Sequence, residues 1–206
     1  MKVVVFGATG TVGKLVVDQA LEQGHQVTAF TRNPVRMALQ HDRLRVAQGD
    51  VTDLAAVQRA IAGHDAVVVT LGAGRKGNVR ADGTRTIIEA MQQSGVRRLI
   101  CQSTLGVGDS RANLNFLWKY VMFGLLLRAA YDDHVRQEDY VKRSNLDWTI
   151  VRPSAFTDGP RTGRYDRDFG SDRKTKLKIS RADVADFIVG QLTDTTYVHR
   201  TPAISY

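Results

Sequence analysis

The sequence contains few of the residues that hold small secreted proteins together. Its 206 residues include a single cysteine, Cys101, which excludes an intramolecular disulfide and a cysteine-based zinc site, and we predict no metal centre. One free thiol is typical of a reducing compartment, so we expect a cytoplasmic protein. With 4 prolines and 43% hydrophobic residues, the chain also differs from disordered and fibrous proteins.

Long apolar runs are absent as well. The first apolar segment, Lys2–Phe6, is too short for a signal peptide. The longest one, Leu114–Ala130, is interrupted by Lys119 and Arg128, which favours a buried or pocket-lining helix over a membrane span. We therefore expect neither a leader nor a membrane partner.

Acidic residues are in the minority. The chain has 21 Asp and Glu against 29 Lys and Arg, which gives a net charge of +8. A basic surface attracts nucleic acid, anionic lipid, phosphorylated cofactors and carboxylates, and the charge does not choose among them. An RNA-binding or scaffold protein is one alternative, but the chain has no aromatic ladder and no recognisable nucleic-acid module. We expect no nucleic-acid partner.

Short apolar segments alternate with helical patterns along the whole chain. The predicted strands are Lys2–Phe6, Gln26–Thr31, Leu44–Gln48, Ala66–Thr70, Arg98–Gln102, Trp148–Val151 and Val198–Ser205. The predicted helices are Thr11–Gln23, Asp53–Ala62, Ala81–Gln93, Phe116–Arg143 and Arg181–Leu192. Such alternation predicts an α/β fold, a Rossmann-like, doubly wound, mostly parallel sheet. We expect a single domain over residues 1–206, acting as a monomer, with substrate-site elements after residue 103.

A glycine-rich segment, Gly7-Ala8-Thr9-Gly10-Thr11-Val12-Gly13, lies between the first predicted strand and the first helix. In this position Gly7 permits a tight turn, Gly10 lets the backbone approach a pyrophosphate, and Gly13 lets helix and strand pack closely. The amides at the helix N-terminus then face the phosphates. The context of strand, turn and helix predicts a dinucleotide site that includes Thr9, Thr11 and Val12.

The end of the second predicted strand indicates which nucleotide is bound. An acidic residue is usual there for NAD, whereas Arg32 and Arg36 suit the 2′-phosphate of NADP(H). Surface arginines without a ligand are the other interpretation. Two further strands end in segments that can border the adenosine half of the cofactor, which adds Asp50, Val51, Leu71 and Gly72 to the predicted site.

The Tyr-x-x-x-Lys pair, in which lysine lowers the pKa of a catalytic tyrosine, is missing from the sequence. Alcohol oxidation and sugar epimerisation by that pair are therefore disfavoured. Reduction of a flavin or a linear tetrapyrrole needs less help, because hydride enters a conjugated acceptor and positioning supplies most of the catalysis.

Four further side chains are candidates for the reacting end of the site. His134 can act as a proton donor or as a hydrogen-bond donor to substrate, or it can be structural. Glu138 shares its predicted helical face and can orient His134 or hold the first turn of that face. Ser103 and Thr104 follow the fifth predicted strand, where they can bind the carboxamide of a nicotinamide or the acceptor, or simply cap the strand end.

Two other segments have two interpretations each. The apolar segment Phe116–Leu127 can form the wall of a pocket for a planar ring, or it can pack in the core. The loop Asp158–Lys176 is long enough to be a mobile substrate loop. The basic residues between Arg161 and Arg181 can bind an anionic substrate or form a solvated face.

Several segments together resemble the atypical short-chain dehydrogenases/reductases. They are GATGTVG, TRNPVR, GDV, QSTLG and LDWTIVRPSAF, at residues 7–13, 31–36, 49–51, 102–106 and 146–156. The segment DDHVR at residues 132–136 and the tail that follows are similar to the biliverdin IXβ reductase subfamily, also called flavin reductases. The resemblance covers nearly the whole chain.

This resemblance implies a Rossmann-like fold, NADP(H) as cofactor, and a flavin or a linear tetrapyrrole as the small-molecule acceptor. It places Thr104, Ser103 and His134 at the active site and adds Arg75 and Pro153 to the cofactor positions. Ser154 stands where the subfamily has a second pocket histidine. The alternatives are a non-catalytic redox sensor of the NmrA-like kind and an atypical epimerase or quinone reductase.

Overall fold

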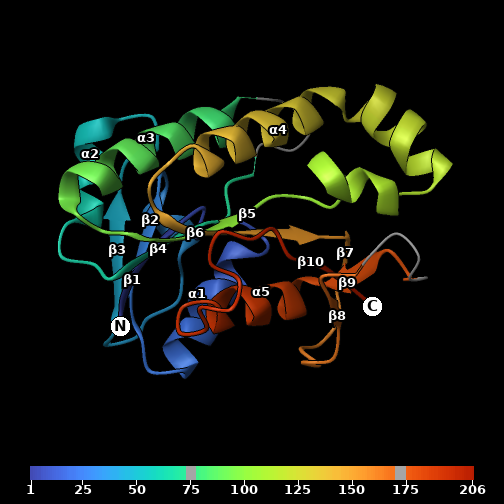
Figure 1. Ribbon diagram of the computed structural model, residues 1–206. Coiled ribbons are helices and arrows are strands. Elements are labelled where there is room, and N and C mark those ends of the chain that lie inside the picture. Colours follow the sequence, from blue (N-terminus) through green and yellow to red (C-terminus); the bar gives the residue numbers. More distant parts are fainter. Residues whose placement is uncertain (73–77, 170–174) are drawn as a thin grey trace.

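A mostly parallel sheet forms the centre of the molecule (Figure 1). The computed structural model describes residues 1–72, 78–169 and 175–206. The strands of the main sheet are β1 (Lys2–Phe6), β2 (Gln26–Thr31), β3 (Leu44–Gln48), β4 (Ala66–Val69), β5 (Arg98–Gln102), β6 (Asp147–Pro153), β8 (Asp166–Arg167) and β10 (Ala203–Ser205). Their order is β3-β2-β1-β4-β5-β6-β10-β8, and only the pair formed by β10 and β8 is antiparallel among the described strands. The predicted α/β, Rossmann-like architecture is confirmed.

Helices cover both faces of the sheet (Figure 1). On one face lie α1 (Gly13–Glu22) and α5 (Arg181–Gly190), which contact each other. The other face is covered by α2 (Leu54–Ile61), α3 (Val79–Ser94) and α4 (Arg128–Lys142). Right-handed crossovers between parallel strands place helices in these two layers.

Two apolar clusters fill the space between the sheet and its helices. Alternate residues of β1 contribute to each of them, with Val3 and Val5 packed toward α1 and α5 and Val4 and Phe6 packed toward α2 and α3. All four of these side chains are fully buried. This explains the continuous apolar runs, since a strand buried on both faces has no solvent side to mark with polar residues.

The long helix predicted over Phe116–Arg143 is interrupted. A wide, π-helical segment, η3 (Leu117–Leu126), precedes α4, and the amide of Leu127 bonds to the carbonyl oxygen of Met122, five residues back. Residues 116–127 are apolar on all sides except at Lys119, so the sequence pattern does not fix a helical phase there. The outer side chains Phe116 and Leu125 are each 74% exposed, whereas Trp118 and Phe123 pack against a third cluster that includes Leu114.

The predictions for the last quarter of the chain need three corrections. The final strand spans Ala203–Ser205 and not Val198–Ser205, because His199 adopts a positive φ of 59° that breaks an extended chain. The loop expected at Asp158–Lys176 contains β8. A second, two-stranded sheet of β7 (Ala155–Thr157) and β9 (Lys178–Ser180) flanks it and was not predicted.

The described part of that loop is also held in place. The carboxylate of Asp183 in α5 accepts hydrogen bonds from the amides of Thr162 and Gly163 at 2.7 and 2.9 Å, and Arg161 pairs with Glu22. These contacts anchor residues 161–163 to α5 and α1, while residues 170–174 lie outside the described part of the chain. The mobility of the loop stays a prediction.

Gly13 provides the closest packing in the first strand–helix turn. A β-carbon on Gly13 would overlap the carbonyl oxygen of Gly7, and Gly7 itself has a φ of +85° that side chains disfavour. The roles expected for these two glycines, a tight turn and close packing, are confirmed. The position at which α1 begins relative to β1 depends on this contact, and so does the position of the whole glycine-rich turn.

We predict that Gly13→Ala lowers the free energy of unfolding by about 1–3 kcal/mol, the range for overpacking, because the obstacle is backbone that has no alternative rotamer. Gly190→Ala is the matched control, since nothing lies within 4 Å of its β-carbon position and alanine favours a helix. Urea denaturation measures both. An unchanged stability in Gly13→Ala would contradict the packing argument.

Candidate functional site

A large cavity opens at the carboxyl ends of the parallel strands. Its volume is about 1230 Å³, which is above the roughly 300–1,000 Å³ typical of a pocket for one small molecule. The lining comes from the segments that follow β1, β2, β3, β4, β5 and β6, and from α3, η3 and α4. In a doubly wound sheet, ligands bind at this edge, where strand order reverses. The size and position suit two ligands placed end to end.

The turn between β1 and α1 forms one end of this cavity. It is closed by a hydrogen bond from the amide of Gly10 to the carbonyl oxygen of Gly7 at 2.9 Å. Val12 precedes α1 and gives it no side-chain cap within the described chain, so the positive end of the helix dipole faces the cavity. Backbone amides and a helix N-terminus at this place can hold a pyrophosphate.

Two arginines border the same end of the cavity. Arg32 follows β2 directly, and Arg36 ends the short turn η1 (Pro34–Arg36); both are exposed and both line the cavity. Asp50, after β3, accepts two hydrogen bonds from Thr52, at 2.6 Å from the hydroxyl and 2.9 Å from the amide. These bonds, and to a lesser extent the charge of Arg32, lower the pKa of the Asp50 carboxyl. The arrangement places cations and a fixed carboxylate around the position of a ribose.

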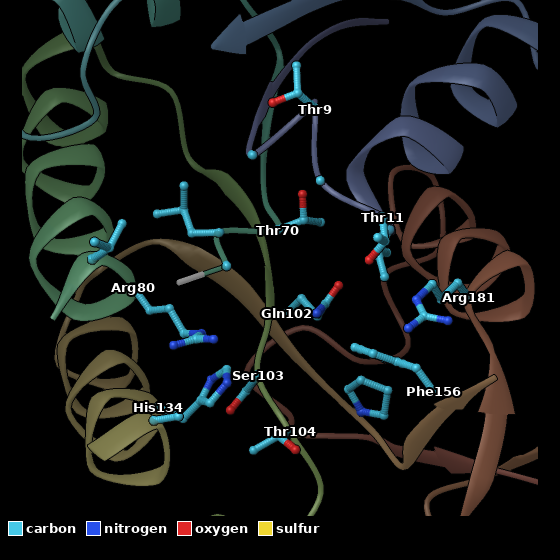
Figure 2. A pocket seen from close by; sticks show the side chains of 18 of the residues that line it. Thr9, Thr11, Thr70, Arg80, Gln102, Ser103, Thr104, His134, Phe156 and Arg181 are labelled. Atoms are coloured by element: carbon cyan, nitrogen blue, oxygen red, sulfur yellow. The ribbon is translucent and has the colours of Figure 1, made fainter. Parts of the chain in front are cut away.

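Unpartnered polar atoms lie in the middle of the cavity. Four buried side-chain atoms that line it lack a hydrogen-bond partner within the described residues: Gln102 Oε1, Ser103 Oγ, Ser154 Oγ and Arg181 Nε. Buried polar groups without partners are costly, so such a concentration in one cavity indicates that a polar ligand completes them. Figure 2 shows Gln102, Ser103 and Arg181 around the same space. A dinucleotide that spans from the glycine turn to Ser103 fits these residues.

The structure brings almost all predicted site residues together. The predicted residues that line the cavity are Gly7, Thr9, Gly10, Thr11, Val12, Arg32, Arg36, Asp50, Val51, Leu71, Gly72, Ser103, Thr104, His134, Pro153 and Ser154. Gly13 lies behind the turn and supports it. Arg75 lies outside the described residues.

His134 belongs to a chain of hydrogen bonds that runs from α4 to α3. Its Nδ1 lies 3.2 Å from Oε1 of Gln137, and Nε2 of Gln137 donates to Oγ1 of Thr84 at 3.0 Å. The imidazole is half-buried, with one edge in the cavity. Desolvation and the nearby charge of Arg80 lower the pKa of His134 to about 4. Near neutral pH the ring is therefore uncharged.

Arg80 is the neighbour of His134 in the cavity (Figure 2). The carboxylate of Asp133 accepts from Nη1 of Arg80 at 3.3 Å and from the amides of Arg80 and Ala81 at 3.2 and 3.0 Å. Asp133 is fully buried and thus joins α4 to the first turn of α3. A buried carboxylate with these donors holds the Arg80 guanidinium at the cavity wall.

Glu138 does not orient His134, contrary to the sequence-based expectation. Its two carboxylate oxygens accept from Nε and Nη2 of Arg152 at 2.9 and 2.7 Å, and Lys142 adds a third contact at 2.9 Å. Burial disfavours the charged form, but these hydrogen bonds outweigh it and lower the pKa of Glu138. The pair instead connects α4 to β6, because residue 138 faces the sheet from its helix.

Apolar and aromatic side chains form the far end of the cavity. They are Leu105, Leu114, Trp118, Phe123, Leu127, Ala130 and Tyr131. Trp118 and Phe123 are in tilted contact with ring centroids 5.7 Å apart, and Phe123 and Tyr131 are in tilted contact at 5.2 Å. Both interpretations of Phe116–Leu127 are thus correct in part, since the inner residues line a pocket and pack against a small core. This end is suited to a flat, conjugated ring.

The basic segment from Arg161 to Arg181 contributes less than expected. Among its described cations, Arg181 lines the cavity, while Arg161 pairs with Glu22 and Arg167 lies over the rings of Tyr165 and Phe187. Arg173 and Lys174 lie outside the described residues. In the described part, the solvated-face interpretation holds for all but Arg181, because the loop turns back along α5.

Sequence reasoning did not single out Arg80, Gln102 or Phe156, which also line the cavity, and it named Arg181 only as one of a run of basic residues. Gln102 ends β5 and was within reach of the strand-end argument that found Ser103. Arg80 has no motif of its own and is placed by Asp133, across 53 residues of sequence. Phe156 and Arg181 are brought together by the unpredicted pair β7–β9, and Arg181 lies over the Phe156 ring.

Comparison with known proteins gives consistent matches. The family described as NAD(P)H-binding matches residues 7–195. UPF0659 protein YMR090W of Saccharomyces cerevisiae is 31% identical, over 93% of this chain and 87% of that protein. The structure of ChuY from Escherichia coli O157:H7, described as an anaerobilin reductase, matches with a TM-score of 0.82 and 25% identity, over 100% of this chain and 97% of that one. A Veillonella parvula short-chain dehydrogenase/reductase, in complex with NADP, has the same fold, with a TM-score of 0.84, 18% identity, and 100% and 94% coverage.

We predict that His134 makes stability depend on pH. The unfolded chain takes up a proton at this histidine near pH 6.5, whereas the folded protein does so only near pH 4. Stability that is fully present above pH 6.5 is therefore lost as the pH falls toward 4, by at most about 3 kcal/mol. Urea denaturation at several pH values should show this loss reduced in His134→Ala. The same loss in both proteins would contradict a neutral, desolvated His134.

Proposed function

The chain belongs to the NAD(P)H-binding family, and we propose that it is an NADPH-dependent reductase of a planar, conjugated small molecule, a flavin first and a linear tetrapyrrole second. One observation carries the proposal. A single cavity joins a dinucleotide site to an aromatic pocket, and unpartnered polar atoms lie at the junction. When bound there, NADPH supplies hydride from its nicotinamide ring.

The residues at the junction support positioning of two rings. Ser103 and Gln102 would hold the carboxamide of a nicotinamide, because Ser103 Oγ can donate to its carbonyl oxygen and Gln102 Oε1 can accept from its NH₂ group. Thr104 and Ser154 line the cavity beside them. Trp118, together with the aromatic residues behind it, excludes water and offers a flat surface. Orientation of this kind supplies most of the catalysis that hydride transfer needs.

The tyrosine in the cavity argues against carbonyl chemistry. Tyr131 is the cavity tyrosine among the described residues, and its hydroxyl donates to the carbonyl oxygen of Gly106 at 3.2 Å. None of the described lining residues is a lysine. The described lining residues therefore do not provide the tyrosine–lysine pair that transfers a proton to a ketone or an alcohol in most short-chain dehydrogenases. Conjugated acceptors that take protons from water do not require proton transfer from a tyrosine.

The similarity to ChuY supports the choice of acceptor. That protein is described as an anaerobilin reductase, and it matches this chain over its full length at 25% identity. A tetrapyrrole acceptor is also consistent with the aromatic end of the cavity described above, which suits flat conjugated rings.

We predict that NADPH binds more tightly than NADH, because Arg32 and Arg36 can donate to the 2′-phosphate. Charge-assisted hydrogen bonds contribute about 1.5–3 kcal/mol before screening, so Arg32→Ala should weaken NADPH at least about tenfold and leave NADH unchanged. Isothermal titration calorimetry measures both. Arg85→Ala, on the exposed side of α3, is the control. Equal affinities in the unmodified protein would exclude this assignment.

We predict that the protein oxidises NADPH in the presence of FMN, riboflavin or biliverdin faster than the uncatalysed reaction. Absorbance of the reduced nicotinamide follows the rate, with quinones as further acceptors. His134→Ala should lower turnover by no more than about a hundredfold, since the neutral ring is not an essential acid. Tight NADPH binding without turnover of any acceptor would instead support a redox sensor, and turnover of quinones alone a quinone reductase.

A further inference from the structure

A hydrogen-bond donor and a hydrogen-bond acceptor lie side by side at the aromatic end of the cavity. The donor is the guanidinium of Arg80, which lines the cavity and is buried, with 7% of its surface exposed. Asp133 fixes it through Nη1 at 3.3 Å, and the backbone of Arg80 is fixed by the same carboxylate. The acceptor is Nε2 of His134, whose ring neighbours Arg80 (Figure 2).

The hydrogen-bond chain behind His134 determines which ring nitrogen carries the proton. The amide of Gln137 donates through Nε2 to Thr84, so its Oε1 faces Nδ1 of His134 and can only accept. With Gln137 in this orientation, the uncharged ring carries its proton on Nδ1. Nε2 then presents a lone pair to the cavity.

Charge around the pair favours electron-rich groups. Asp133 carries one negative charge, and it is shared between Arg80 and Arg136, whose Nη2 lies 3.6 Å from Oδ1. The N-terminus of α3 adds a partial positive charge at the same place. The other acidic groups near the ring are engaged elsewhere, since Glu138 pairs with Arg152 and Asp132 with Arg128.

A carboxylate fits this pair only in part. Its oxygens would accept from Arg80, but the second oxygen would meet the lone pair on Nε2 of His134. An N–H group next to a carbonyl satisfies both residues, because the carbonyl oxygen accepts from Arg80 while the N–H donates to His134. Such an edge occurs in lactams and cyclic imides.

We propose that Arg80 and His134 recognise the N–H/C=O edge of a cyclic amide on the acceptor. The proposal rests on the proposed function, because it concerns the acceptor reduced in this cavity. The pyrimidine ring of a flavin and the terminal rings of a linear tetrapyrrole both carry this edge, whereas a quinone offers carbonyls without the N–H. The pair thus selects among flat rings that stack equally well on Trp118.

The test compares riboflavin with 3-methylriboflavin, in which a methyl group replaces the hydrogen of the imide N–H. Binding to the full-length protein, saturated with NADP⁺, is followed by quenching of flavin fluorescence. In the unmodified protein, methylation should weaken binding about tenfold or more, because it leaves the lone pair of His134 without a donor. In His134→Ala the methyl group should have little effect. His41→Ala, an exposed histidine outside the cavity, should behave as the unmodified protein does.

Two results would overturn the proposal. One is that riboflavin binds no better than its methyl derivative to the unmodified protein, or does not bind at all. The other is that His134→Ala weakens both flavins equally. The Arg80→Lys variant is an independent test, because it keeps the positive charge but removes the planar guanidinium. It should weaken the binding of riboflavin and of 3-methylriboflavin to the same degree, since both flavins keep the carbonyl that accepts from Arg80.

A spectroscopic measurement checks the basis of the proposal without a ligand. The ¹⁵N chemical shifts of the His134 ring should identify Nδ1 as the protonated nitrogen, and a protonated Nε2 would contradict it. Both tests measure the resting protein or equilibrium binding. A protein that binds riboflavin as expected but does not oxidise NADPH would therefore disprove the proposed reduction and leave the recognition intact.

Discussion

The close approach of Gly13 to the carbonyl of Gly7 is the constraint on which the rest of the site depends. It brings α1 against the end of β1, so that the start of the helix and the glycine turn face one cavity. Because β1 lies between β2 and β4, the loops after all three strands then reach the same ligand. A larger residue at position 13 would move the helix and the turn together. The loops after β2 and β4 would then no longer reach the same ligand as the turn.

The far half of the cavity is organised by a different kind of interaction, a buried carboxylate. Asp133 joins α4 to the N-terminus of α3 and holds Arg80, while Glu138, one turn and a half further along α4, joins that helix to β6 through Arg152. Buried charges of this type are costly when unpaired, so each one fixes the position of its partners. His134 lies on α4, and the segment that carries the aromatic wall, η3, leads into that helix. The geometry of the acceptor end is thus set by polar contacts, and that of the nucleotide end by close packing of glycine.

This division also explains what the sequence could predict. Strands β1 to β6, four of the helices and the nucleotide site follow from local patterns, because glycine spacing and apolar runs are read within a few residues. Arg80 depends on a partner far away in the chain, Asp133, and no local pattern marks it. Arg181 belongs to a basic run, but its place beside Phe156 depends on the pairing of β7 with β9, which no local pattern predicts. The break between η3 and α4 was missed because a segment that is apolar all round has no polar face to set its phase. Glu138 was assigned to the wrong partner because helical spacing gives neighbours along one helix and not contacts with the sheet behind it.

The central claim is that the nicotinamide of NADPH and a flat acceptor meet face to face in the one cavity, with the nicotinamide held on a single face. The most direct measurement is the kinetic isotope effect on riboflavin reduction with NADPH deuterated at either of the two C4 positions. The account predicts a slower reaction for one of the two isotopomers only, because a ring fixed beside Ser103 exposes one hydrogen to the acceptor. Equal rates for both, or equal slowing of both, would contradict it.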